Sequence, residues 1–325
     1  MMLLKSAVGA LVWQCSFLAV SAAVHKRIVS GMAAEPGEFP WIVSIQTGRH
    51  FHNCAGTLLD STTVLTAAHC TTRYHSQFVR AGSLNSSDGG VVVQVQSRRN
   101  HPEYQEGYIK WPGVSTPSPG GQPDSIGDMS SSPDSNATIT KDEFEASRRL
   151  YEANDIAVLK LKTPIPESDT VAYAKLPISN SDPMAKSTAV VAGWYKKLTS
   201  EQGAPQPIFD MLNKVAISIL ARDYCRSLAP EVGDRDTVVC TDSKHGNACV
   251  YDSGGPLVDK QTREVIGVAS FSLPEKGLDE QEAKKCGDAP MMYTRVASYL
   301  SFIHENLGAA NQTQVTKPMV TQPDC

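Results

Sequence analysis

The chain has 325 residues and a formal net charge of −4 at pH 7, and 41% of its residues are hydrophobic while 20% are charged. This length accommodates one large or two medium domains, and the composition is that of a soluble globular protein with a sizeable core. The slightly acidic balance provides no basic field for nucleic acid, so polynucleotides are excluded as expected partners.

Residues 1–23 are predicted to be a signal peptide. A short basic start precedes an apolar run from Ala7 to Val20, which is too short to span a bilayer, and Ser21-Ala22-Ala23 supplies small residues for cleavage. A buried N-terminal helix is the alternative, but a basic pair, Lys26-Arg27, follows at once. We therefore expect a secreted, extracellular protein whose mature form has no membrane segment.

Short alternating or apolar runs bounded by Gly, Asn, Ser and Asp predict strands of small closed barrels. In the first half of the chain these runs are 41–46, 56–60, 64–67, 78–81 and 91–95. In the second half they are 188–192, 213–220, 238–240, 255–258, 265–270 and 292–296. An amphipathic helix is expected over 297–307, with a core-facing side formed by Tyr299, Leu300, Ile303 and Leu307.

A Pro-, Gly- and Ser-rich segment interrupts the first half at about 105–150. Residues 111–135 cannot bury enough apolar surface to offset their ordering entropy, so a mobile loop is expected there. Thr140 and Glu143 form a potential capping box for a helix that continues to about residue 153. The segment is either a tolerated surface insertion without a task or a functional loop.

Three N-glycosylation sequons begin at Asn85, Asn136 and Asn311, the last in a polar tail over 308–325. They indicate a glycoprotein with surface-exposed loops at these positions.

The strongest chemical signal is Ser253, between Asp252 and the pair Gly254-Gly255. Glycines let the backbone turn sharply, which would present the hydroxyl beside backbone N–H donors. A serine is a weak nucleophile alone and requires a histidine base oriented by a carboxylate. His69, in Thr66-Ala67-Ala68-His69-Cys70, and Asp155, at the head of an apolar run, are the candidates.

The order His69, Asp155, Ser253, with these flanks, resembles the chymotrypsin/trypsin family of serine endopeptidases (peptidase family S1). The resemblance covers most of the chain: it includes Arg27-Ile28-Val29-Ser30-Gly31, Phe39-Pro40-Trp41, Gly193-Trp194 and Tyr293-Thr294-Arg295-Val296 and extends to about Leu307. It implies an all-β domain over 28–307, built from two antiparallel six-stranded β-barrels with a C-terminal helix. In the family, the loop that is enlarged here overhangs the substrate groove.

The resemblance implies acyl transfer to water. His69 would accept the hydroxyl proton of Ser253, while Asp155 fixes its tautomer. The backbone N–H groups of Tyr251 and Ser253 would form the oxyanion hole, but relatives carry glycine where this chain has Tyr251. The chain is therefore expected to be a serine endopeptidase with reduced activity, or alternatively a catalytically weak or inactive homologue that acts as a secreted protein-binding module.

Activation by proteolysis is also implied. Residues 24–27 would be a short propeptide, and cleavage after Arg27 by an activating protease would free Ile28, whose ammonium pairs with Asp252. Expected partners besides that protease are protein or peptide substrates and protein inhibitors.

The specificity pocket of the family corresponds here to Asn247, Ser272 and Met291. Asn247 brings no charge for a basic substrate side chain, and Met291 would fill much of the depth of the pocket. Cleavage after Arg or Lys is therefore not expected, and small or short apolar side chains are preferred.

Of eight cysteines, Cys15 leaves with the signal peptide, and seven remain in a compartment that permits disulfides. Six of these allow fifteen pairings, and the resemblance implies Cys54–Cys70, Cys225–Cys240 and Cys249–Cys286. Cys325 is then left over as a free or intermolecular thiol. No cofactor is expected. Some members of the family bind calcium through acidic residues in the region of Asn85, but the turn here carries only one acidic residue, Asp88, so no metal is expected either.

Overall fold

The computed structural model describes residues 31–110, 148–194 and 211–308, except for residues 74, 234, 245, 250 and 274–289. The signal peptide, the activation junction, most of the insertion and the C-terminal tail predicted from the sequence lie outside these residues. The same holds for Arg27, Ile28, Asn136, Cys286, Asn311 and Cys325.

The first half of the chain forms a closed antiparallel barrel with the strand order β2-β3-β4-β9-β6-β5. Its strands are β2 (Ile42–Gln46), β3 (His52–Asp60), β4 (Thr63–Thr66), β5 (Phe78–Ala81), β6 (Val91–Asn100) and β9 (Ala157–Leu161). All nine residues of β3 are buried, because the strand is covered by the barrel interior on one side and by the second half of the chain on the other. The first six-stranded barrel is thus confirmed.

The second half forms a seven-stranded sheet with the order β1-β11-β10-β13-β14-β15-β12. Its strands are β1 (Met32–Ala33), β10 (Thr188–Gly193), β11 (Asn213–Ser218), β12 (Val238–Thr241), β13 (Pro256–Asp259), β14 (Val265–Ser272) and β15 (Met291–Arg295). A bridge between Ile219 and Thr241, with a 2.8 Å hydrogen bond from Leu220 N to Cys240 O, joins β12 back to β11. Six strands therefore close into the second expected barrel, and β1 pairs on its outside.

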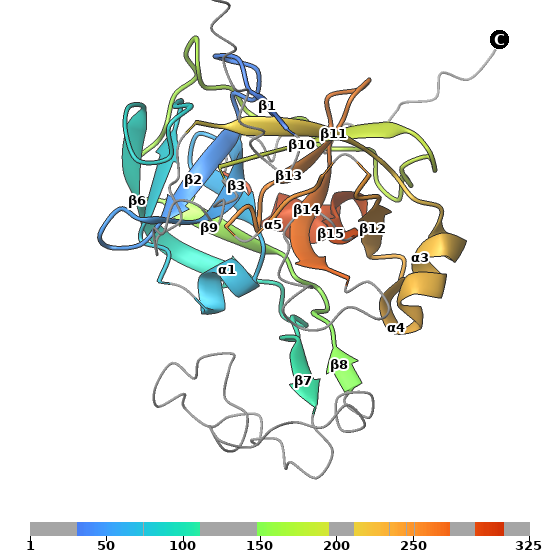
Figure 1. Ribbon diagram of the computed structural model, residues 1–325. Coiled ribbons are helices and arrows are strands. Elements are labelled where there is room, and N and C mark those ends of the chain that lie inside the picture. The colour runs from blue at the N-terminus through green and yellow to red at the C-terminus, as the bar shows by residue number, and fades with distance from the viewer. Residues whose placement is uncertain are drawn as a thin grey trace, which may run out of the picture.

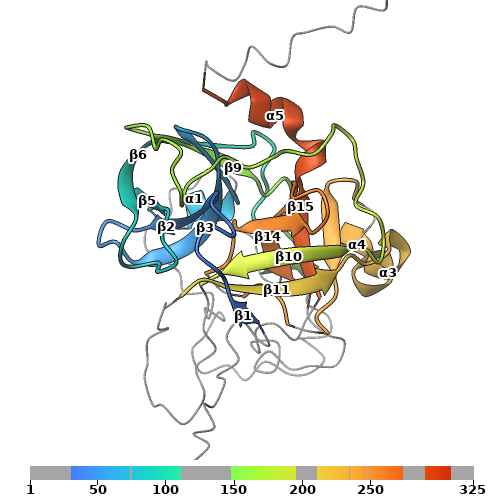
Figure 2. The ribbon, with the colours of Figure 1, turned by 90° about the horizontal axis from the view of Figure 1, so that it is seen from above.

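The first described strand and the last described helix each reach across to the other half of the molecule, and Figure 2 shows β1 beside β11. At the N-terminal end, β1 pairs with β11 of the second barrel, with Met32 opposite Lys214. At the C-terminal end, the helix η2 (Val296–Ser298) leads into α5 (Leu300–Glu305). Leu300 and Ile303 join the apolar core of the first barrel, as expected from the sequence, together with Tyr299 and Phe302. Each end thus packs on the half of the molecule built from the opposite part of the chain.

The inserted segment begins and ends as a hairpin that projects from the barrels (Figure 1). Strands β7 (Tyr108–Lys110) and β8 (Arg148–Leu150) pair antiparallel, and Gln105 and Ala153 exchange backbone hydrogen bonds of 2.9 and 3.0 Å. The prediction of a helix continuing to residue 153 is wrong over its last residues. The two strands of the hairpin, β7 and β8, follow and precede the neighbouring barrel strands β6 and β9. By pairing with each other, they satisfy their own backbone polar groups.

Three short helices were not predicted: α1 (His69–Thr72), α3 (Arg222–Leu228) and α4 (Pro230–Gly233). Disulfides join Cys54 to Cys70 and Cys225 to Cys240, which are two of the implied pairings. Cys249 is also disulfide-bonded. In the part of the chain that the structure describes, no helix has both the length and the apolar character needed to span a membrane.

Candidate active site

His69 and Asp155 are brought together by the pairing of β4 with β9. Thr66 lies opposite Ala157, and the chain continues from Thr66 into α1, which begins at His69, while Asp155 immediately precedes β9. One oxygen of Asp155, Oδ2, accepts from His69 Nδ1 at 2.8 Å, and the other, Oδ1, accepts from His69 backbone N–H at 2.9 Å. The carboxylate therefore fixes both the ring and the backbone of His69.

The electrostatics of this buried pair favour its charged form. Burial acts to lower the pKa of His69, but the negative charge and hydrogen bond of Asp155 outweigh burial and raise the pKa above its ordinary value of 6.5. Burial likewise acts to raise the pKa of Asp155, but the charge of His69 and hydrogen bonds from His69 and Ser270 hold it below 3.8. Asp155 is thus ionised at neutral pH and can stabilise an imidazolium.

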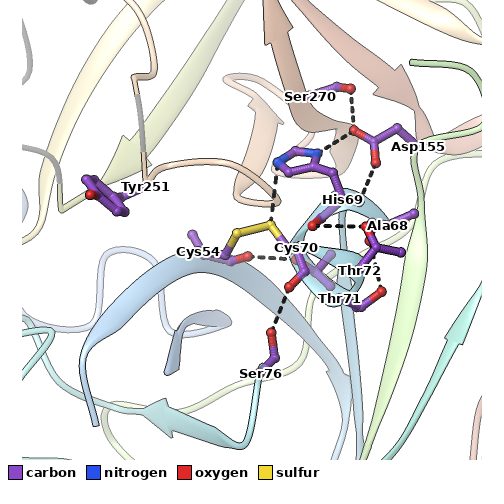
Figure 3. The surroundings of a disulfide bond; sticks show 12 residues. Cys54, Ala68, His69, Cys70, Thr71, Thr72, Ser76, Asp155, Tyr251 and Ser270 are labelled. Carbon is purple, nitrogen blue, oxygen red and sulfur yellow. Dashed lines mark hydrogen bonds and ion pairs between the residues drawn. A yellow bond between two sulfur atoms is a disulfide. The ribbon is translucent and has the colours of Figure 1, made fainter. Parts of the chain in front are cut away.

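Ser270 supports this carboxylate, as Figure 3 shows. Its hydroxyl donates to Oδ2 of Asp155, and Thr294 Oγ1 donates to the backbone carbonyl of Asp155 at 2.8 Å. Both residues come from the second barrel, so the carboxylate is held from both halves of the molecule. Sequence reasoning missed these two supports, because neither residue stands near Asp155 in the chain or in a motif of its own.

The segment carrying Ser253 is folded as consecutive turns. Asp252 N donates to Cys249 O at 2.9 Å, and its buried carboxylate accepts from Cys249 N at 3.0 Å. The segment is fixed to both barrels, since Ala55 N donates to Ser253 O and Gly254 N donates to Ala269 O, each at 2.8 Å.

Gly254 is required in this turn. Its φ is +78°, a conformation that side chains disfavour, and a Cβ there would lie 2.6 Å from the backbone oxygen of Ala55. The turn predicted from Ser-Gly-Gly therefore needs glycine at position 254, because Gly254 lies against the backbone of the first barrel.

The Cys54–Cys70 disulfide connects the backbone that is hydrogen-bonded to Ser253 with the backbone next to His69. Ala55, which bonds the Ser253 carbonyl, follows Cys54 directly, and Cys70 follows His69. Within the described residues no hydrogen bond joins Ser253 Oγ to His69 Nε2, which instead lies 3.7 Å from Cys70 Sγ. Cys54, His69 and Cys70 are close enough to share a metal ion, but the disulfide leaves no thiolate to bind one.

Tyr251 has the left-handed backbone conformation that glycine adopts readily, with φ of +76°. Its carbonyl accepts from Nε2 of buried His52 at 3.0 Å, and His52 Nδ1 lies 2.8 Å from Ser44 Oγ. A carbonyl only accepts, so Nε2 carries the proton and Nδ1 of the neutral ring accepts from Ser44. Burial lowers the pKa of His52 to about 4, which keeps the ring neutral at pH 7. Sequence reasoning did not connect His52 with this loop, because the two segments lie far apart in the chain.

Asn247 lies at the base of the predicted specificity pocket and is 1% exposed. Its amide group donates to Thr241 Oγ1 at 2.9 Å and to Asp242 O at 2.8 Å. Its Oδ1 accepts from Ala248 N at 2.9 Å and from Tyr293 OH at 2.7 Å. All the donors and acceptors of this amide are therefore used within the protein.

The two residues predicted to line the walls of this pocket differ in burial. Met291 is buried and packs in the core cluster of the second barrel with Ala248 and Tyr293. It pairs across the sheet with Ser272, which is exposed. Ser272 and Met291 thus lie on the paired strands β14 and β15, whereas Asn247 lies in the segment that follows β12 and offers no unused polar group.

Among the predicted glycosylation sites, Asn85 lies in the described part of the chain, on a turn. Its side-chain oxygen accepts from Ser87 N at 2.8 Å and from Asp88 N at 3.1 Å. The side chain is half-buried, so modification there remains a prediction.

Comparisons with known proteins agree with this architecture. The model of the Trypsin family matches residues 28–118 and 121–303. The chain is 30% identical over 292 residues to "Fibrinolytic enzyme, isozyme C" of Lumbricus rubellus, covering 86% of this chain and 99% of that protein. It is 30% identical over 249 residues to trypsin beta of Drosophila erecta, covering 75% and 78% of the two chains.

The structure of human heparin binding protein is similar in fold, with a TM-score of 0.58 and 23% identity over 86% of this chain and 98% of that one. The two barrels and the matched family model define the class: the protein belongs to the trypsin family of serine proteases.

Proposed function

We propose that this protein is a secreted serine endopeptidase that hydrolyses peptide bonds through an acyl-enzyme on Ser253. The observation that carries the proposal is the doubly hydrogen-bonded, buried His69–Asp155 pair beside the turn that holds Ser253. His69 would take the hydroxyl proton of Ser253 and return it to the leaving amine, with Asp155 stabilising the intermediate imidazolium. The backbone N–H groups of Tyr251 and Ser253 are proposed to receive the oxyanion.

Covalent labelling with a fluorophosphonate tests this function directly. Protein cleaved after Arg27 is expected to take up one equivalent of the reagent, and Ser253→Ala and His69→Ala are expected to abolish uptake. Ser270→Ala serves as a control for the supporting contact and should slow labelling without abolishing it. Failure of correctly cleaved, disulfide-intact protein to react would exclude an activated serine.

Cleavage after Arg27 is proposed as the activating step. The new ammonium of Ile28 would pair with the buried carboxylate of Asp252, whose contact with Cys249 N shapes the turn before Ser253. The proposal of secretion rests on the signal peptide predicted over residues 1–23.

The proposed preference is for small or short apolar side chains. Asn247 has no unused polar group for a substrate ammonium or guanidinium, and Met291 occupies the interior of the second barrel. A buried cation without a counter-ion is strongly unfavourable, so cleavage after Arg or Lys is not expected.

The alternative function is a secreted protein-binding module without effective catalysis. The buried Met291, the fully hydrogen-bonded Asn247 and Tyr251 favour it. If the side chain of Tyr251 turns its N–H away from the oxyanion, loss of that one donor costs about 10² to 10³ in turnover. The labelling experiment separates the two functions.

A further inference from the structure

The helix that carries His69 is a single turn, and contacts at its two ends fix its place. Helix α1 spans His69–Thr72, and Arg73 N donates to His69 O at 3.0 Å just after it. At its start, the carboxylate of Asp155 accepts from the backbone and the ring of His69 (Figure 3). One helical turn is not stable by its own backbone bonds, so these end contacts decide where His69 lies.

Arg73, at the other end of α1, joins the helix to both limbs of the insertion. The outgoing limb is residues 103–106, and the return limb is residues 151–154. Arg73 Nε lies 2.7 Å from Glu106 Oε1, and Arg73 Nη2 lies 3.0 Å from Glu152 Oε1. The Glu152 side chain is 11% exposed and that of Glu106 is 52% exposed. The ion pair with Glu152 is therefore the one less screened by water and salt.

The return limb connects Glu152 to Asp155 through residues that are themselves held. Ala153 exchanges backbone hydrogen bonds of 2.9 and 3.0 Å with Gln105 of the outgoing limb. Asn154 Nδ2 donates to a carbonyl of the same limb at 2.8 Å. The return limb and α1 are thus joined at two places, once through Asp155 and once through Glu152.

Glu152 is a second negative charge near His69, and Arg73 opposes it. Burial acts to lower the pKa of His69 and Asp155 raises it, while smaller effects of opposite sign come from the positive charge of Arg73 and the negative charge of Glu152. Tyr104 also lies near Arg73 and Asp155, but burial raises the pKa of its phenol, which stays neutral at pH 7. Because Arg73 and Glu152 form one ion pair, their effects on His69 offset each other.

We propose that Arg73 is a positioning residue for the proposed general base: it fixes and neutralises Glu152, which would otherwise act on His69 as a second carboxylate. The proposal rests on the proposed endopeptidase function, in which His69 is the base. Arg73 acts through Glu152 and through the end of α1 rather than on the substrate. Without Arg73, the sheltered carboxylate of Glu152 is unpaired and favours the imidazolium, which cannot accept a proton.

The test measures the pH at which half of His69 has lost its proton. Arg73→Gln leaves the carboxylate of Glu152 unpaired, so this midpoint is expected to rise by about half a pH unit. Glu152→Gln leaves the guanidinium unpaired, so the midpoint is expected to fall by a similar amount. The double variant should lie close to the unmodified protein, because both charges are gone. Arg73→Lys keeps a positive charge and should restore most of the original midpoint.

Two measurements give the midpoint. The rate of fluorophosphonate labelling reports it in protein cleaved after Arg27. NMR titration of isotope-labelled histidine rings reports it in the matching Ser253→Ala proteins without catalysis, with His69→Gln to identify the resonance. Arg226→Gln is the matched control, because it removes an arginine of α3 that pairs with an exposed carboxylate, Asp223, and it should leave the midpoint unchanged.

Equal midpoints in Arg73→Gln and Glu152→Gln, or shifts in the same direction, would overturn the role of Arg73, since loss of packing alone does not move the two in opposite directions. Should Arg73→Gln fail to fold, the midpoint of Glu152→Gln decides: a fall supports the proposal, and an unchanged value overturns it. Absence of labelling in the unmodified protein would instead contradict the proposed catalysis, and the NMR titration would still decide the role of Arg73.

Discussion

At the scale of single residues, the charge state of His69 decides when the proposed nucleophile is activated. Asp155 raises the pKa of His69 above 6.5 despite its burial, and only the neutral ring can accept the Ser253 proton. The rate of fluorophosphonate labelling is therefore expected to rise with pH, with a midpoint above 6.5. Asp155→Asn should move the midpoint downward, and a midpoint at or below 6.5 in the unmodified protein would contradict the assignment.

Stability has the opposite dependence on this group. Because the folded-state pKa of His69 is raised, its contribution is complete below the unfolded-state value of 6.5 and is lost as pH rises through the folded-state value. Conditions that neutralise His69 for catalysis thus remove part of the attraction that holds it to Asp155.

Tyr251 stores strain in the turn before Ser253. A residue with a Cβ pays about 1 to 2 kcal/mol in the left-handed region, where Tyr251 has φ of +76°. Tyr251→Gly is expected to be more stable than Tyr251→Ala by about 1 kcal/mol, since both lose the phenol but only glycine relieves the strain. Urea unfolding of the two variants measures the difference, and equal stabilities would show that the turn is relaxed.

At the scale of elements, β12, β15 and the segment before Ser253 enclose Asn247 completely. Because the missing charge at Asn247 is one reason not to expect cleavage after Arg or Lys, Asn247→Asp should create such cleavage, but the structure predicts otherwise. An aspartate loses the donors to Thr241 and Asp242 and places a carboxylate against a carbonyl oxygen. We expect a loss of about 2 to 3 kcal/mol in unfolding free energy and no gain in basic specificity.

Thermal unfolding and peptide profiling check this prediction. Met291→Gly, alone and combined with Asn247→Asp, tests whether the side chains accepted by the pocket are limited by its space or by its charge. A stable Asn247→Asp protein that cleaves after Arg would show that the amide network is dispensable.

The strands of both barrels were predictable because their alternating or apolar runs are bounded by turn residues. The run 78–81 matches β5 at both ends. The predicted helix is wrong at 148–153. The capping signal at Thr140 and Glu143 is local, whereas the pairing of β8 depends on β7, a strand far away in the sequence.

At the scale of the whole molecule, the position of His69 beside Asp155 was predictable from motifs in family order. The contacts of Ser270, His52 and Arg73 were not, since each joins segments far apart in the chain. Motifs identify residues whose chemistry is distinctive alone, whereas a supporting serine or arginine is identified only by its neighbours.

The packing of β1 on the second barrel and of α5 on the first constrains the order in which the molecule can assemble. Strand β1 cannot pair until β11 has been synthesised, and the first barrel lacks part of its apolar cover until α5 is complete. During synthesis from the N-terminus, the first barrel thus remains unfinished until the last described helix emerges. A chain truncated before Val296 leaves exposed the surface that Leu300, Phe302 and Ile303 cover, so the core beneath the proposed catalytic residues is completed only after α5 has been synthesised.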